Sequence, residues 1–255
     1  MMKRILILLL TINLVGCATK KEVLYFQDIR EPGTQIPQPD SIYQYPEIQV
    51  NDILKIDITA LDEESVMPFK FEKLAVQGTR QLELLKLEGY VVDKNGTINY
   101  PQLGQVDVAG KTTQQLQKYL EELLSVYIKD PTVKVRLLNF KISILGEVNN
   151  PGTYTLTEES ITLPQALGLA GDLTIKGKRE NVLIMRTVDG VRKSTAIDMT
   201  QTDWMDSPYF YLKQNDVIYV SPNGPKVASA GFIGNVGTLL SVVSILLSAV
   251  VLLAR

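Results

Sequence analysis

The side chains that most often perform chemistry are scarce in this sequence. It contains no histidine, so the commonest metal ligand and general base is missing. Its acidic residues cluster at Asp62, Glu63 and Glu64, but no motif places two carboxylates across a cleft. It also has no glycine-rich phosphate loop and no nucleophile elbow. We therefore expect no catalytic residue, no metal site and no cofactor, and we do not expect an enzyme.

The only cysteine, Cys17, has the setting of a lipid attachment site. Two basic residues precede the apolar stretch Ile5–Val15, which has the length of a secretory signal and is too short to span a bilayer. The letters LVGC that end it are typical of a lipobox, whose cysteine receives diacylglycerol and becomes the mature N-terminus. The alternative is a plain signal peptide with a chance cysteine. We expect a signal peptide over 1–16 and a lipid anchor at Cys17, and Ala18 in place of aspartate favours the outer membrane.

One basic run, Lys176-Gly177-Lys178-Arg179, is open to two interpretations. It is either a solvated loop before a strand or a contact for acidic sugars. The whole chain has a pI near 5.4 and a net charge of −2. Nucleic acid requires a basic face, so we expect no nucleic-acid partner.

The residues between the two ends predict an α+β fold. Apolar and polar residues alternate with the period of half-buried strands, or apolar residues run together, over 52–60, 132–138, 140–148, 181–187, 191–197 and 216–220. Apolar residues at helical spacing predict an amphipathic helix over 111–127. A second, shorter helix is expected over 162–171, with Gly171 just beyond its end. Both helices begin with the spacing of a capping box, at Thr112 and Gln115 and at Thr162 and Gln165.

Four further segments are expected to contain turns or a loop. Asn95-Gly96 tolerates the positive φ of a tight turn, so 89–101 is expected to form a hairpin. The acidic segment 62–73 is expected to be a loop. An Asn-Asp pair occurs just before a strand at both 50–54 and 214–218, where it could turn the chain into that strand. We do not interpret this similarity as a true sequence repeat.

The first half resembles the export domain of polysaccharide export lipoproteins of the Wza type. The opening pattern of that family, Tyr-x-Ile-x-x-x-Asp-x-Leu-x-Ile, is matched over 45–56 with one extra residue after Tyr45. The family's next patterns are kept at Asp93, Gly96, Ile98, Pro101, Leu103 and Gly104, then at Val106, Val108, Gly110 and Thr112, and finally at Asp130, Pro131, Val133 and Val135. The resemblance implies an export domain over 45–139.

The second half is similar to a soluble-ligand-binding β-grasp domain. The matching residues are Gly146, Glu147, Val148, Pro151, Gly152 and Tyr154, followed by Ala166, Leu167, Ala170 and Gly171. This implies a β-grasp domain over 140–222, joined to the lipid anchor by a tether over 17–44. The proline-rich part of that tether, 31–45, is expected to be extended. Longer members of the family carry two or more such domains, whereas this chain has room for one, which implies a shorter periplasmic body.

The resemblance also implies a function. It implies a ring of identical subunits at the outer membrane, with its body in the periplasm, that passes capsular or extracellular polysaccharide outward. The implied partner is an inner-membrane polysaccharide co-polymerase, which is often a tyrosine kinase. Two alternatives stay open: a lipid-anchored glycan-binding module without a conducting pore, and a purely structural envelope lipoprotein.

The C-terminal segment 227–254 contains no charged residue. As a helix, 230–253 would be about 36 Å long, enough for a bilayer of about 30 Å. Large apolar residues occupy one half of the helical wheel. The other half holds Gly234, Gly237, Thr238, Ser241, Ser244 and Ser248, with Asn235 at its edge.

This two-sided pattern predicts an amphipathic helix that spans the outer membrane. One interpretation is that several copies form an α-helical barrel, with the small and hydroxyl residues facing a watery lumen and the large residues facing lipid. Helices suit a lumen because their backbone groups are satisfied internally. The alternative is that the small residues only pack helices together, since they allow close approach in membranes.

Overall fold

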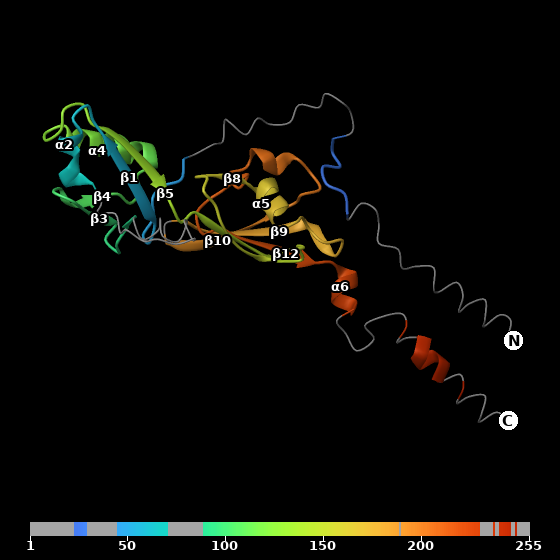
Figure 1. The fold of residues 1–255 in the computed structure, drawn as a ribbon. Coiled ribbons are helices and arrows are strands. Elements are labelled where there is room, and N and C mark those ends of the chain that lie inside the picture. The colour runs from blue at the N-terminus through green and yellow to red at the C-terminus, as the bar shows by residue number, and fades with distance from the viewer. Residues whose placement is uncertain are drawn as a thin grey trace.

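The computed structural model describes residues 23–29, 45–70, 89–188, 190–229, 237, 240–245 and 248. These residues form two domains joined end to end, with α6 following the second (Figure 1). Sheets with few helices make up both domains, so the predicted α+β class is confirmed. The expected lipid anchor at Cys17 lies outside the described residues.

The first domain contains a small antiparallel sheet in the order β2-β1-β5. Its elements are β1 (Ile53–Thr59), α2 (Glu63–Val66), η3 (Met67–Phe69), β2 (Tyr90–Val91), β3 (Thr97–Tyr100), β4 (Gly104–Asp107), α4 (Thr113–Leu124) and β5 (Thr132–Leu137). β1 and β5 are paired from Leu54 and Leu137 to Thr59 and Thr132. Alternate residues of both strands are buried, as period-two alternation requires.

Helix α4 covers this sheet with one apolar face. Leu116, Leu120 and Leu124 are fully buried, because residues three and four positions apart share a helix face. The predicted capping box is present: the Thr112 hydroxyl accepts from the Gln115 backbone N–H, and the Gln115 side chain accepts from the Thr112 N–H.

Two local predictions for this domain are wrong. The strands on either side of Asn95-Gly96 do not pair as a hairpin, because β2 joins β1 and β3 pairs with β4. The turn itself does form: Gly96 has φ +81°, and a Cβ there would lie 2.7 Å from the Ala109 side chain. The segment 62–70 is not a loop, since the Asp62 side chain caps α2 by accepting from the Glu64 N–H.

The second domain is built on a five-stranded sheet in the order β10-β9-β12-β6-β7. Its elements are β6 (Lys141–Gly146), β7 (Gly152–Thr155), β8 (Ile161–Thr162), α5 (Leu163–Leu169), β9 (Gly177–Val188), β10 (Val191–Ile197), η4 (Asp203–Asp206), β11 (Tyr211–Leu212), β12 (Val217–Pro222) and α6 (Gly224–Ser229). β12 is parallel to β6 and antiparallel to β9, and the strands predicted over 181–187 and 191–197 are confirmed as parts of β9 and β10, which pair antiparallel.

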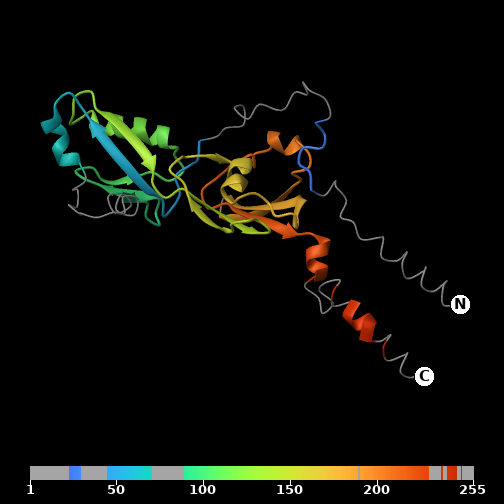
Figure 2. The same ribbon diagram turned by 45° about the vertical axis from the view of Figure 1, so that its right-hand side comes forward.

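One face of this sheet is covered by α5 and the β8–β11 pair (Figure 2). The inward side chains of β6, β9 and β12 are fully buried and pack with Leu163, Ala166 and Leu167 of α5. The capping box at Thr162 and Gln165 is present. Gly171 has φ +73°, as expected just beyond a helix end, so this second predicted helix is confirmed.

Candidate functional site

The described residues of the N-terminal segment, 23–29, form a strap against the second domain. The Tyr25 hydroxyl donates to the Asp172 carboxylate over 2.6 Å, and the Arg179 guanidinium lies 5.1 Å from the centre of the Tyr25 ring. Burial is the main reason that the pKa of the Tyr25 hydroxyl is raised, and its hydrogen bond to the Asp172 carboxylate is the second. Phe26 stacks on the buried Trp204 at 6.5 Å between ring centres. The part of the expected 17–44 tether that the structure describes, 23–29, is therefore packed against the second domain, and the expected extended stretch 31–44 lies outside the described residues.

Main-chain and side-chain hydrogen bonds also attach the strap to the second domain. The Gln27 backbone N–H donates to the Thr200 carbonyl over 2.6 Å. The Asp28 carboxylate accepts from both the backbone N–H and the hydroxyl of Thr202, and the hydroxyl bond is the main reason that its pKa is lowered. No sequence signal for this contact was recognised, although three aromatic or acidic residues, Tyr25, Phe26 and Asp28, stand close together.

A cleft of about 880 Å³ lies between the strap and the second domain, where it is bounded by Glu180 of β9 and by the segment 198–201 that follows β10. It is lined by Leu24, Tyr25, Phe26, Gln27, Asp28, Glu180, Asp198, Thr200 and Gln201. The lining combines carboxylates, amides and a hydroxyl, which can hydrogen-bond to a hydroxyl-rich ligand, with two aromatic rings. It holds no lysine or arginine.

The structure divides the basic run at 176–179. Lys176 and Lys178 are exposed, whereas Arg179 is 5% exposed, stacks on Tyr25 and donates to the Gly177 carbonyl over 3.0 Å. Arg179 therefore holds the strap, and the interpretation of the whole run as a contact for acidic sugars is wrong for this residue.

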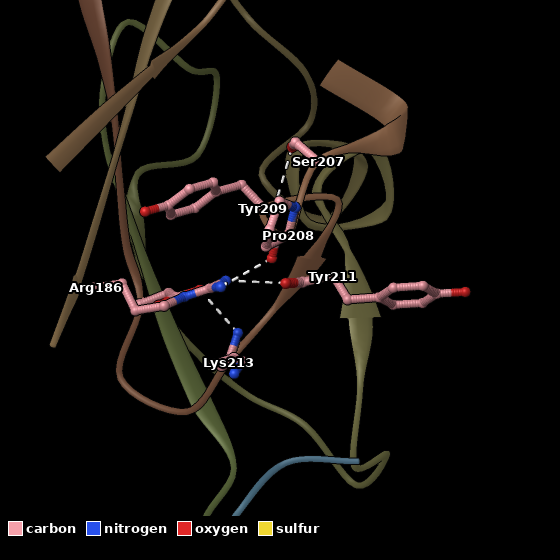
Figure 3. A network of polar contacts seen from close by, with 7 residues as sticks. Arg186, Ser207, Pro208, Tyr209, Tyr211 and Lys213 are labelled. Atoms are coloured by element: carbon pink, nitrogen blue, oxygen red, sulfur yellow. Dashed lines mark hydrogen bonds and ion pairs between the residues drawn. The ribbon is translucent and has the colours of Figure 1, made fainter. Parts of the chain in front are cut away.

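A buried ion pair fixes the layers of the second domain together. Arg186 on β9 meets Asp216, just before β12, at 2.6 Å, and the two side chains are 5% and 0% exposed. The same guanidinium donates to the Pro208 and Tyr211 carbonyls, each over 2.9 Å (Figure 3). It also lies 4.8 Å from the centre of the Tyr209 ring. Arg186 thus ties the β11 segment to the sheet, and a lone arginine at an inward-facing position of an apolar strand was the signal that could have revealed it.

The two domains meet at a second buried carboxylate, Asp52. It is 1% exposed and accepts from the Gln49 N–H over 2.8 Å and from the Gln214 side-chain amide over 3.2 Å. The Gln214 amide also donates to the Asn139 carbonyl, and its oxygen accepts from the Lys141 N–H. Burial raises the pKa of Asp52 to about 6, because no cation compensates the lost hydration.

Of the predicted lumen or helix-contact face, the structure describes Gly237, Ser241, Ser244 and Ser248, all of them helical. The Ser241 hydroxyl donates to the Gly237 carbonyl over 2.9 Å and the Ser248 hydroxyl to the Ser244 carbonyl over 2.8 Å. Hydroxyls satisfied within their own helix can lie at water or against another helix. Gly234, Asn235 and Thr238 lie outside the described residues.

None of the helices formed by the described residues has the length and hydropathy that crossing a membrane requires. The expected spanning helix over 227–254 is therefore not supported by the part of that segment the structure describes. Within this same part of the chain, no three metal-ligating side chains lie close enough together to hold an ion.

The described residues form two small α+β domains in series. Residues 40–138 match the polysaccharide biosynthesis/export protein family, and residues 140–220 match the SLBB domain. These matches coincide with the two domains of the fold. Together and in this order, the two matches support a Wza-type polysaccharide export protein.

Three curated relatives are similar to this chain. The EPS I polysaccharide export outer membrane protein EpsA of Ralstonia solanacearum is 29% identical over 137 residues, which cover 52% of this chain and 36% of EpsA. The capsule polysaccharide export protein BexD of Haemophilus influenzae is 24% identical over 190 residues, 74% of this chain and 46% of BexD. The capsule polysaccharide export outer membrane protein CtrA of Neisseria meningitidis is 24% identical over 220 residues, 85% of this chain and 54% of CtrA.

The chain thus matches about a third to a half of the length of these relatives. The names of EpsA and CtrA agree with the outer-membrane location that the sequence predicts. The description of the matched family names export and does not name a catalysed reaction.

Proposed function

We propose that this protein is a subunit of a ring-shaped outer-membrane translocon that passes capsular or extracellular polysaccharide out of the periplasm without catalysing a reaction. The observation that carries the proposal is the order of an export domain and an SLBB domain, with the strap 23–29 packed against the SLBB domain and α6 following its last strand. The named relatives export polysaccharide, which supports the same substrate class here.

The two attachments give the molecule an orientation. The strap begins at Val23, six residues after Cys17, and six extended residues reach at most about 20 Å. A lipid on Cys17 would therefore keep the SLBB domain close to the membrane. On the same domain, α6 continues from β12 and is held by the Lys226–Glu147 ion pair at 3.7 Å. The export domain then lies farther from the outer membrane, where an inner-membrane co-polymerase or tyrosine kinase could reach it.

In this proposal the terminal segment 227–254 spans the outer membrane, and copies from several subunits form an α-helical barrel. The two-sided pattern of the segment supports this arrangement, with Ser241 and Ser244 toward the lumen and Leu240 and Val243 toward lipid. Packing of helices through the small face, without a lumen, is the competing arrangement, and the internal bonds of Ser241 and Ser248 are compatible with both.

A specific observation favours a second candidate function. The cleft of about 880 Å³ beside the strap has carboxylates, amides and aromatic rings, the groups that bind sugar hydroxyls and ring faces. A lipid-anchored glycan-binding module would need this cleft but no spanning segment.

One experiment separates these functions. The full chain and a variant ending at Lys226 are expressed in a bacterium that lacks its own export protein, and surface polysaccharide is measured. We expect the full chain to restore export, and the shortened protein to stay lipid-anchored and folded but to export nothing. Normal export by the shortened protein would exclude the terminal barrel and favour the binding module.

Cysteine labelling tests the lumen. Ser241→Cys and Ser244→Cys should react with a water-soluble thiol reagent in the assembled protein, whereas Leu240→Cys and Val243→Cys should not. Equal labelling of both faces would contradict a lumen at this position.

A further inference from the structure

The second face of the SLBB sheet is open. α5 and β8 lie on one side of the sheet, and no described helix or strand covers the other (Figures 1 and 2). Because side chains alternate along a strand, burial of Ile144, Ile184 and Ile218 on the helix side turns their neighbours to the open side.

The centre of this open face is apolar. Leu145, Tyr219, Leu183 and Ala196 stand side by side across four hydrogen-bonded strands, as the strand registers show. The next row places Val217 beside Met185. Leu145 is 44% exposed, and the other large side chains of the two rows are half-buried. An apolar row that crosses a sheet is unusual at a free surface and typical of an interface.

The charges at the edge of this face are mainly basic. The strand registers turn Lys141 and Arg192 to the open side, and the exposed Lys178 and Glu180 of β9 alternate with the buried Gly177 and Arg179. Arg192 lies on the edge strand β10, opposite Thr187, and is exposed. The open face is therefore apolar with a basic margin.

The back of the same domain has the opposite charge. It is formed by 156–170 and 201–212, which include α5, η4 and the β8–β11 pair. Every charged residue in these two segments is acidic: Glu158, Glu159, Asp203 and Asp206. Leu169 of α5, which belongs to the first of these segments, is 47% exposed. The back thus combines an exposed apolar residue with acidic ones.

We infer that the occupant of the open sheet face is the back of the SLBB domain of a second copy of this chain. Apolar rows and opposite charges on two different surfaces of one domain fit a head-to-tail contact, and such a contact closes into a ring when its rotation allows. This inference rests on the proposed ring and assigns the surfaces that build it.

Cross-linking tests the contact in the full chain. Ser194→Cys places a thiol on the open face, beside Met185, and Leu169→Cys places one on the back. Membranes carrying the double variant are treated with a short bismaleimide. We expect a ladder of dimers, trimers and larger species from the double variant, and monomer from each single variant.

Two outcomes would overturn the inference. Dimers from Ser194→Cys alone would mean that two open faces meet each other, and monomer from the double variant would mean that the two surfaces do not meet. Export is measured in the same cells. Export without the ladder rejects this contact and leaves the proposed function standing, whereas the ladder without export supports the contact and rejects the proposed function.

Charge reversal gives an independent test. Arg192→Glu should lower the fraction of assembled protein at least tenfold, and adding Asp203→Arg and Asp206→Arg should restore most of it. The matched control is Arg136→Glu, an exposed arginine on β5 of the export domain, which should assemble normally. Equal assembly of Arg192→Glu and the control would contradict the charge pairing.

Discussion

The chain enters a strand through the same turn in both domains, at Asn51-Asp52 before β1 and at Asn215-Asp216 before β12. The two asparagines have φ of +69° and +65°. In each turn the aspartate N–H donates over 3.1 Å to the carbonyl three residues earlier, and its carboxylate accepts over 2.8 Å from the N–H of that same residue. The short sequence similarity therefore encodes one local structure twice.

The two turns differ in what faces the buried carboxylate. From outside its own turn, Asp216 meets the Arg186 cation at 2.6 Å, whereas the described side chain that bonds to Asp52 is the neutral amide of Gln214, at 3.2 Å. Both carboxylates are almost fully buried, so the local backbone does not set their electrostatics. The comparison teaches that a turn fixes the position of a carboxylate and that the residues packed against it from elsewhere fix its electrostatic environment.

Removing the Arg186 cation should cause the largest loss of stability. Arg186→Met leaves the Asp216 carboxylate buried without its partner and deprives the Pro208 and Tyr211 carbonyls of their donor. We expect the free energy of unfolding of the second domain to fall by about 3–5 kcal/mol. Urea unfolding of the detergent-solubilised protein, followed by the fluorescence of the single tryptophan, Trp204, measures it.

Two controls accompany this variant. Arg136→Met, at an exposed position, should change stability by less than about 0.5 kcal/mol. Asp216→Leu added to Arg186→Met removes the unpaired charge and should recover part of the loss. Equal stability of Arg186→Met and wild type would mean that the ion pair does not hold the layers together.

Removing the Gln214 amide, the neutral partner of Asp52, should lower the free energy of unfolding by less. Gln214→Leu removes the amide that bonds to Asp52, the Asn139 carbonyl and the Lys141 N–H. We expect a loss of about 2 kcal/mol, because buried polar groups are left unsatisfied. Gln102→Leu, exposed in the export domain, is the control. A loss as large as that of Arg186→Met would remove the distinction between the two turns.

The pH dependence of stability should distinguish Asp52. Its pKa of about 6 in the folded protein lies above the usual value of about 3.9 in an unfolded chain. The folded state therefore holds this proton more tightly, and the resulting stabilisation is fully present below about pH 4 and is lost as the pH rises through about 6.

Asp52→Asn removes this titration. The stability of wild type relative to the variant should fall by about 1–2 kcal/mol between pH 4 and pH 7. Urea unfolding at several pH values tests it, and a constant difference between the two proteins would contradict the raised pKa.

The smallest effects should come from the shared backbone geometry. Asn51→Ala and Asn215→Ala remove the short polar side chain that helps asparagine to adopt positive φ, so each variant should lose about 0.5–1 kcal/mol of stability. Asn51→Gly and Asn215→Gly should be close to neutral. Similar losses at both positions would confirm that the turns are equivalent, whereas a loss at one position alone would break the comparison.

The sequence by itself determined the features that depend on near neighbours. The strand alternation, the capping boxes at Thr112 and Thr162 and the turns at Asn51 and Asn215 each depend on residues within a few positions of one another. Hydrogen bonds over three residues and the two-residue period of a strand are written into a short stretch of chain. The domain order was likewise predictable, because its motifs are local.

Tertiary structure alone decided which distant elements meet. β3 pairs with β4 rather than with β2, the strap around Phe26 stacks on Trp204, and Arg186 finds Asp216 thirty residues away. Such choices depend on which surfaces and charges are buried together once the whole domain has packed, and a carboxylate's pKa depends on the same burial. For that reason the same Asn-Asp turn carries a paired charge in one domain and an uncompensated one in the other.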